Sequence, residues 1–265
     1  MSIVRYSAAV SLAALMMAPA AASAETFDWI AGEWSLELGA TGMIAPGFEG
    51  SKKYKFTAIP VFSLGKSGND TRFSSRNDSI SFALIDDGNI RVGLAGQFLW
   101  KEEFDGIDGL DPVRWGGEVG GFFEFYPLDW MRARAELRHG IRAHNGFVAD
   151  FSADAFKDVT PDIRISAGPR VSLASADFFD TYFGITAEES QRSGVSEYNP
   201  GGGIRSAGVG GAISWKATDN ITASLFGEYS RLMGPAADST IVQERGSRDQ
   251  FTIGLSTSYR FDFRL

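Results

Sequence analysis

Residues 249–263, DQFTIGLSTSYRFDF, alternate almost without error between two kinds of side chain. One face of this run carries Phe251, Ile253, Leu255, Thr257, Tyr259, Phe261 and Phe263, and the other carries Thr252, Gly254, Ser256, Ser258, Arg260 and Asp262. Alternation with a period of two indicates a β-strand whose two faces meet different environments. Aromatic residues at the end of the apolar face are typical of a strand that contacts lipid.

Ten further runs of strand length precede this one and are separated by turn residues. They cover residues 34–40, 54–64, 80–84, 92–100, 115–125, 131–137, 147–155, 163–173, 207–215 and 221–229. A bacterial single-chain barrel with both ends on one side of the membrane has an even number of strands. We therefore expect an all-β fold, a transmembrane antiparallel up-and-down β-barrel of about twelve strands, with about ten as the alternative. Residues 71–76 and 181–186 are the two candidates for the missing strand.

The N-terminus has the pattern of a secretory signal. Arg5 precedes an apolar stretch at residues 8–19, and Ala22-Ser23-Ala24 matches an A-x-A cleavage site. An N-terminal core helix is the alternative, but this segment has no polar face. We expect residues 1–24 to be removed after Sec-type export and residues 25–265 to form a barrel in the outer membrane of a Gram-negative bacterium. No later stretch reaches the roughly 18 apolar residues of a transmembrane helix.

Composition excludes several kinds of site. The chain has a formal net charge of −8 and no basic run, so it is a poor candidate for binding nucleic acid. It contains no cysteine, which rules out disulfides and thiolate metal ligands. We expect no metal and no cofactor.

The connections between the runs differ in length in a regular way. Those at residues 127–129, 159–162 and 217–220 are short, whereas those at residues 101–113, 174–202 and 233–248 are long. Barrels place short turns in the periplasm and long loops outside. We expect an interfacial aromatic girdle at the ends of the runs, formed by Trp100, Tyr126, Trp130 and Trp215.

Charged residues in the middle runs share one face. A three-residue turn at residues 127–129 places Glu124 opposite Arg132 and Glu118 opposite Arg138, and unlike charges in such positions stabilise a sheet by roughly 0.2–1 kcal/mol each. The predicted charge ladder consists of Glu118, Glu124, Arg132, Arg134, Glu136, Arg138, Asp150, Asp154, Arg164 and Arg170.

The ladder decides which face points inward. An arginine facing lipid at the midplane costs about 2–4 kcal/mol, so in a barrel these residues must line the lumen. The alternative is a soluble antiparallel sandwich whose charged face is solvated. That alternative gives no reason for aromatic residues at the run ends.

Four segments of the chain have a recognisable order and spacing. They are Pro46-Gly47-Phe48-Glu49-Gly50-Ser51 followed by Tyr54, residues 181–186 and 198–203, and Glu244-Arg245-Gly246-Ser247-Arg248-Asp249-Gln250-Phe251 before a closing Tyr259-Arg260-Phe261. Together they resemble the MipA/OmpV family of outer-membrane proteins. The ending Phe263-Arg264-Leu265 departs from the aromatic last residue usual in such barrels. The resemblance covers nearly all of the chain after residue 24, and it implies an outer-membrane β-barrel.

The resemblance also implies a function class. The family's namesake is a scaffold that brings the lytic transglycosylase MltA together with a bifunctional murein synthase, and other members are described as porin-like. We expect a scaffold for peptidoglycan enzymes first, with outer-membrane lipid, a lytic transglycosylase and a murein synthase as partners. A porin-like passive channel for small solutes is second, since lumen arginines favour anions.

An enzyme is the third and least favoured class. The two histidines, His139 and His144, are expected to be interfacial or solvated rather than catalytic. Glu118 and Glu124 are expected to pair with arginine, and residues 201–203 precede no helix pattern that would hold a phosphate. A scaffold needs a periplasmic contact surface, and the candidate residues are Glu25, Thr26, Phe27, Asp28, Trp29 and Ile30.

Overall fold

A computed structural model describes residues 32–66 and 73–264 of the chain. The predicted signal at residues 1–24 lies outside the described residues, and so do the six predicted contact residues Glu25, Thr26, Phe27, Asp28, Trp29 and Ile30. Both remain predictions.

The described residues form eleven strands in one antiparallel sheet. They are β1 (Glu33–Pro46), β2 (Tyr54–Lys66), β3 (Ile80–Asp86), β4 (Ile90–Leu99), β5 (Gly116–Leu128), β6 (Met131–Ile141), β7 (Phe147–Asp158), β8 (Ile163–Ala174), β9 (Gly203–Lys216), β10 (Ile221–Leu232) and β11 (Asp249–Arg264). Each predicted run lies largely within one of these strands. Their order is β2-β1-β11-β10-β9-β8-β7-β6-β5-β4-β3, so β11 joins the first hairpin to the rest of the sheet.

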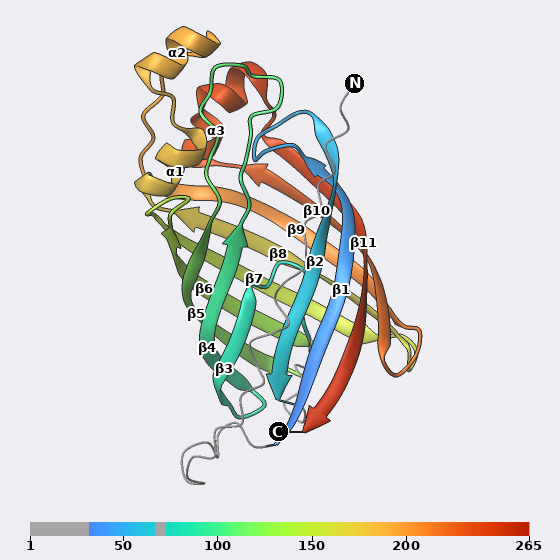
Figure 1. Cartoon of the computed structure of the whole chain (residues 1–265). Helices are drawn as coiled ribbons and strands as arrows, with labels where there is room; N and C mark the ends of the chain where they lie inside the picture. Colours follow the sequence, from blue (N-terminus) through green and yellow to red (C-terminus); the bar gives the residue numbers. More distant parts are fainter. Residues whose placement is uncertain (1–31, 67–72, 265) are drawn as a thin grey trace, which may run out of the picture.

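The sheet curls round on itself, and β2 and β3 approach each other at its two edges (Figure 1). It is one curled sheet and not two packed sheets, so the sandwich alternative is wrong. We call its inside the lumen. The end that carries the helices and the long connections is the loop end, and the end with the short connections at residues 87–89, 129–130, 159–162 and 217–220 is the turn end.

The described residues do not contain the expected twelfth strand. Residues 181–186 lie in helix α1 (Ala176–Phe183) and the turn after it, because Tyr182 and Phe183 share a buried helical face with Phe178 and Phe179. Residues 73–76 are inside the lumen, and residues 71–72 lie outside the described part of the chain. Eleven strands leave β2 and β3 running in the same direction, since every neighbouring pair between them is antiparallel.

The outer face of the sheet is apolar and exposed. Its exposed side chains include Leu94, Phe98, Val119, Phe123, Leu137, Phe151, Ile165, Val209, Ile213, Leu225, Ile253 and Leu255. Trp100 and Trp115 lie at the loop end, and Trp130 and Trp215 lie at the turn end, all about half exposed or more. Tyr126 does not join them, because it is 3% exposed and points into the lumen. The expected girdle role of Tyr126 is therefore wrong.

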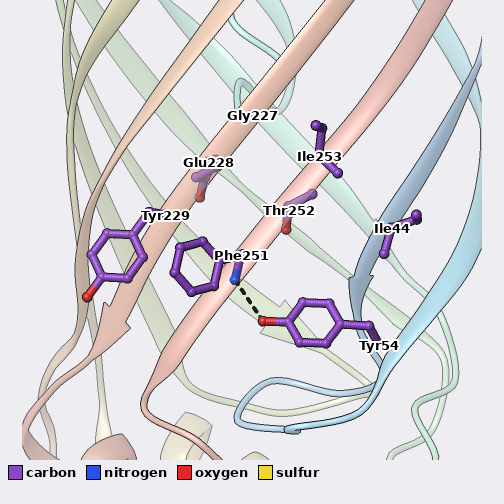
Figure 2. Close-up of a pocket in the computed structure, with 8 residues that line it drawn as sticks. All are labelled: Ile44, Tyr54, Gly227, Glu228, Tyr229, Phe251, Thr252 and Ile253. Atoms are coloured by element: carbon purple, nitrogen blue, oxygen red, sulfur yellow. Dashed lines mark hydrogen bonds between the residues drawn. The ribbon is translucent and has the colours of Figure 1, made fainter.

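A shallow groove of about 340 Å³ marks this outer face where β1, β10 and β11 meet (Figure 2). Gly227, which has no side chain, lies in the groove, and Tyr229, Phe251 and Ile253 line it. The backbone N–H of Phe251 donates to the hydroxyl oxygen of Tyr54 at 3.2 Å. The exposed lining of the groove is almost entirely apolar.

Short helices form a cap at the loop end. Beside α1 these are α2 (Ala187–Ser193), α3 (Gly234–Asp238) and the π-helix η1 (Ile241–Arg245). Among the described residues, no helix combines the length and the apolar character needed to span a bilayer.

Candidate functional site

The lumen face of β5 to β8 carries the charged residues singled out in the sequence. Seven of them are buried, namely Glu118, Glu124, Arg132, Arg134, Glu136, Arg138 and Asp154. Arg170 and Asp150 are partly buried beside them. Even-numbered positions of β5 and β6 face the same way because successive strand residues point to opposite faces. The lumen wall is therefore lined by charge, while the outer face is apolar.

The register of β5 and β6 differs from the expected one by two residues. Glu124 is directly opposite Arg134 instead of Arg132, and Arg138 is opposite Gly120 instead of Glu118. The cause is the turn, because β5 continues through Pro127 to Leu128 with an irregular register after Phe125. A shift of two residues keeps every side chain on its face. The expected contacts still form diagonally, at 3.1 Å from Arg132 to Glu124 and 2.8 Å from Arg138 to Glu118.

Glu124 is the centre of the lower part of this network. Its two carboxylate oxygens accept from Arg91 at 2.8 Å, from Arg132 at 3.1 Å and from Arg134 at 2.5 Å. Arg132, which is fully buried, also donates to Asp154 at 2.8 Å. Three guanidinium groups thus share one carboxylate, and charge-assisted bonds of this kind are the strong ones in proteins.

Arg138 is the centre of the upper part. It bonds Glu118 at 2.8 Å and Asp150 at 2.6 Å, and it also contacts Glu136. Arg205 of β9 lies 3.6 Å from Asp150 and 3.6 Å from Glu49, which carries the ion pairs up to the loop end.

His144 lies at the top of this network, and its position corrects the expectation of an interfacial or solvated ring. It is 3% exposed, lies 3.0 Å from Glu118, and accepts the backbone N–H of Gly146 at 3.1 Å through Nδ1. Phe178 and Tyr182 of the cap cover the ring edge-on. Within the turn at residues 142–146, His144 and Gly146 are buried while Arg142 and Asn145 are exposed. His139, by contrast, packs against Phe147.

Arg164 does not belong to the buried network. It lies near the turn end and pairs with Asp158 at 2.6 Å, with side-chain exposures of 35% and 57%. Arg164 is the second residue of β8 (Ile163–Ala174), at the turn end, and its exposed pair with Asp158 lies outside the buried part of the predicted ladder.

The residues that precede β3 were not expected in the lumen. We call residues 73–79 the inner segment. Phe73 stacks on Phe156 with ring centroids 4.8 Å apart, and its carbonyl accepts from the Tyr126 hydroxyl at 3.3 Å. Asp78 accepts from both terminal nitrogens of Arg132, at 2.6 and 2.9 Å.

The inner segment also reaches the opposite wall. Asn77 donates to Glu228 of β10 at 2.6 Å, and the Arg76 guanidinium lies 4.6 Å from the centre of the Phe226 ring. The sequence carries a signal for this position, because the inner segment is rich in polar and charged residues and is therefore unsuited to contact lipid.

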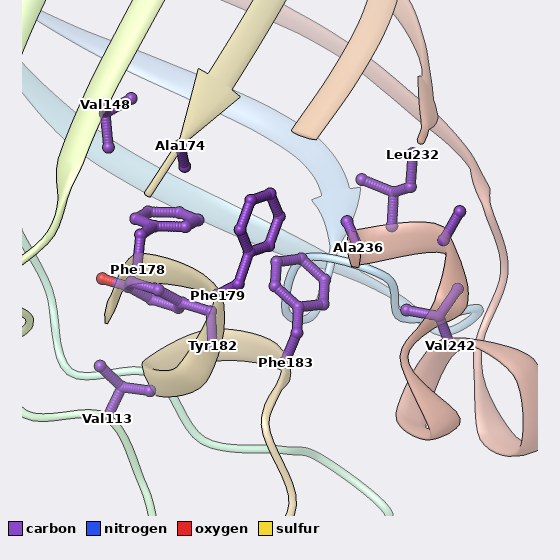
Figure 3. Packing of buried hydrophobic residues seen from close by; sticks show 11 residues of the cluster. Val113, Val148, Ala174, Phe178, Phe179, Tyr182, Phe183, Leu232, Ala236 and Val242 are labelled. Carbon is purple, nitrogen blue, oxygen red and sulfur yellow. The ribbon is translucent and has the colours of Figure 1, made fainter. Parts of the chain in front are cut away.

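The loop end is closed by an apolar core (Figure 3). Phe179 and Phe183 of α1 are fully buried against Leu232, Ala236 and Val242. The sequence offered a signal here, since Phe178, Phe179, Tyr182 and Phe183 have the spacing of one helical face. A capping box at Thr186 and Glu189 likewise marks the start of α2.

Two carboxylates lie under the cap outside the strands. Burial raises the pKa of Glu102 to about 7, with a further increase from the charge of Glu49, while Lys55 acts in the opposite direction. Burial also raises the pKa of Glu49, and Arg205 opposes this shift. Glu102 Oε1 is buried and has no hydrogen-bond partner in the described structure. The charge of the Glu102 side chain therefore changes near neutral pH.

Within the described ranges, no group of three or more His, Asp or Glu side chains is arranged to hold a metal ion. The buried carboxylates Glu118, Glu124, Glu136 and Asp154 are engaged by arginine instead.

The sequence matches one family model, described as "MltA-interacting protein MipA", over residues 38–261. No curated protein matches the chain. Among solved structures, an outer membrane channel from Pseudomonas putida F1 is similar with a TM-score of 0.45 and 9% identity, covering 90% of this chain and 100% of that one. A structure titled "Bacterial polysaccharide outer membrane secretin" has a TM-score of 0.43 and 10% identity, covering 85% and 98%. The fold of this chain is defined by its own strand pairing and not by these similarities.

Proposed function

The chain belongs to the MltA-interacting protein MipA family, and from this premise we propose that it is an outer-membrane scaffold for peptidoglycan enzymes. Its partners in this proposal are a lytic transglycosylase and a murein synthase. The name of the family suggests binding to MltA, a lytic transglycosylase, and the resemblance of the sequence suggests the murein synthase. The chain itself is proposed to have no catalytic role.

The outer face supports the proposed location. Exposed leucine, isoleucine, valine and phenylalanine side chains surround the sheet, and tryptophans lie at both of its ends. Such a band with aromatic borders is how barrel strands meet a bilayer. Residues 1–24 are proposed to direct export, and residues 25–265 to form the membrane domain. We expect recovery in the outer-membrane fraction and heat-modifiable migration on gels, and recovery as a soluble periplasmic protein would contradict the location.

The state of the lumen is the observation that favours a scaffold over an open pore. The arginines of β6 are paired with carboxylates, the inner segment crosses the lumen, and the cap packs an apolar core over the loop end. Arginines already bound to carboxylates attract anions weakly. In this structure the interior is occupied by the protein's own residues, and partners would bind at the surface of the protein.

The partner surface is proposed to lie at the turn end, which faces the periplasm in this proposal. The turns there are short, and they offer little area against the roughly 1,200–2,000 Å² of a stable interface. Residues 25–30 precede β1, whose first residues pair with Arg264 at the turn end. We therefore include residues 25–30 in the contact surface.

Affinity capture tests the scaffold. The full mature chain in detergent or nanodiscs is expected to retain a purified lytic transglycosylase, and deletion of residues 25–30 is expected to weaken capture while the sheet stays folded. Deletion of α2, an exposed helix at the opposite end, is the matched control and should leave capture unchanged. Absence of capture by the intact protein would remove the scaffold proposal.

A porin-like passive channel is the second candidate. Its support is that Arg76 and Asn77 of the inner segment remain exposed inside a polar lumen. Conductance of the purified protein in planar bilayers measures this function. If the protein conducts ions and does not capture a lytic transglycosylase, a passive channel would replace the scaffold as the proposed function.

A further inference from the structure

Asp78 is held in the lumen as a bound carboxylate would be. Both of its oxygens accept from the two terminal nitrogens of Arg132, at 2.6 and 2.9 Å, and one of them also accepts the backbone N–H of Ser75 at 2.8 Å. Arg134 Nε lies 3.8 Å from the other oxygen. Two parallel N–H to oxygen bonds from one guanidinium group are the recognition geometry for a planar carboxylate.

The two arginines at Asp78 have unused hydrogen-bond donors. Arg132 Nε and Arg134 Nη2 are buried and have no hydrogen-bond partner in the described part of the chain. The carboxylates near these arginines each accept from more than one guanidinium group. Glu124 accepts from three, and Glu136 accepts from Arg134 and Arg138. Removing Asp78 would leave further buried donors without acceptors, which is costly.

The inner segment is attached to the wall through side chains. Ser79 donates to Glu136 through its hydroxyl at 2.6 Å and through its backbone N–H at 3.2 Å, Arg170 donates to the Ser75 hydroxyl at 3.2 Å, and Asn77 donates to Glu228. Where the chain is described, no backbone-to-backbone bond joins this segment to a wall strand. The segment can therefore leave its place without opening the sheet.

We propose that Arg132 and Arg134 form a binding site for a carboxylate group, and that Asp78 occupies it as an internal ligand in this structure. A solute that carries a carboxylate competes with Asp78 and releases the inner segment. The tether gives Asp78 an effective concentration on the order of millimolar or more, so a competing solute needs either a high concentration or additional contacts. This site is independent of any contact with peptidoglycan enzymes, and its tests use no transglycosylase.

The first test replaces the internal ligand by a free one. Asp78→Ala is expected to lower the unfolding temperature of the purified protein by roughly 10 °C. Sodium formate, the smallest carboxylate, is expected to restore most of this loss, whereas sodium chloride at equal ionic strength is not. Asp158→Ala, which removes an exposed carboxylate paired with Arg164, is the matched control and should respond equally to both salts.

The unfolding temperature of folded Asp78→Ala in formate and in chloride decides whether a free carboxylate can fill the site. Equal effects of formate and chloride would overturn the site. If Asp78→Ala does not fold in chloride, refolding is repeated in formate, where the heat-modifiable folded band is expected to reappear. Failure to fold in both salts would count against a site that a free carboxylate can fill.

The second test follows the segment. Because the chain has no cysteine, Asn77→Cys with Glu228→Cys gives one thiol pair across the lumen, and a short bifunctional thiol reagent is expected to link it. Formate should lower the yield of this link more than chloride does. Ser214→Cys with Ser224→Cys, whose hydroxyls are 2.8 Å apart on neighbouring strands, should link equally in both salts. An unchanged yield for the first pair would show that Asp78 is a fixed structural group.

Discussion

At the scale of single residues, the lumen shows why buried charges here depend on each other. Arg132 is fully buried, and each of its neighbours Glu124 and Asp154 is 1% exposed. Taking such charges out of water is costly, and the cost is offset only while every partner is in place. An exposed pair such as Arg164 with Asp158 is screened by water and contributes little.

Arg132→Met tests this difference. It leaves Asp78, Glu124 and Asp154 without a shared partner, so the free energy of unfolding is expected to fall by about 3–5 kcal/mol. Arg164→Met at the exposed pair is expected to change it by about 0–1 kcal/mol. Denaturant titration of the refolded proteins measures both, and equal effects would contradict the buried network.

Glu102 gives the cap a dependence on pH. Its pKa is raised to about 7 in the folded protein, above the usual value near 4.5. Between these two pH values the folded state holds a proton at Glu102 that the unfolded state has lost, so the contribution of Glu102 to stability falls as pH rises from about 4.5 to about 7. Glu102→Gln is expected to flatten this slope and to raise the unfolding midpoint at pH 8 relative to the native protein.

The neighbouring Glu103 supplies the control for this experiment. It is exposed, and a hydrogen bond from Lys101 lowers its pKa. Glu103→Gln should therefore retain the loss of stability between pH 5 and 8. A native protein whose unfolding midpoint does not change over that range would show that Glu102 is not protonated in the fold.

At the scale of elements, the hairpin of β5 and β6 shows what sets a register. The hydrophobic alternation determines which residues face the lumen, but it allows shifts by two residues. Close contact between the backbones of β5 and β6 then decides which of these registers forms. Gly120 is directly opposite Arg138, and a Cβ atom there would lie 1.9 Å from the backbone carbonyl oxygen of Leu137.

Gly120→Ala is expected to disturb this hairpin, because backbone atoms cannot move aside as a flexible side chain can. We expect a lower unfolding temperature and less heat-modifiable protein after refolding. Gly96→Ala on the neighbouring β4 is the control, since its Cβ would lie 3.4 Å from the Glu118 carbonyl oxygen, close to ordinary contact. Equal behaviour of the two variants would argue against this register.

At the scale of the whole molecule, the inside and outside of the sheet are reversed relative to a soluble protein. Charged residues gather inside, and large apolar residues are exposed outside. In water the outer band would be a large exposed apolar surface, which soluble monomers rarely carry. In lipid the same band is the favourable surface.

Leu255→Arg tests the outer band in the middle of β11, where Leu255 is 64% exposed. An arginine facing lipid is expected to cost about 2–4 kcal/mol of folding free energy in liposomes. Leu255→Ser at the same position keeps the side chain uncharged and should cost less. Equal folding yields in liposomes would place this face outside the membrane.

The sequence alone located eleven strand-length runs, their inward and outward faces, and the charged lining of β5 and β6, because alternation along a strand is a local property. The twelfth strand that it also led us to expect is not found among the described residues. The sequence missed the two-residue shift of the β5–β6 hairpin, the buried position of His144 and the inward turn of Tyr126. Only the tertiary structure decided that the residues before β3 lie inside the lumen on Arg132 and that α1 covers it. Those contacts join residues far apart in the chain, such as Asp78 with Arg132 and Asn77 with Glu228, and no local pattern records which distant partner completes a buried charge.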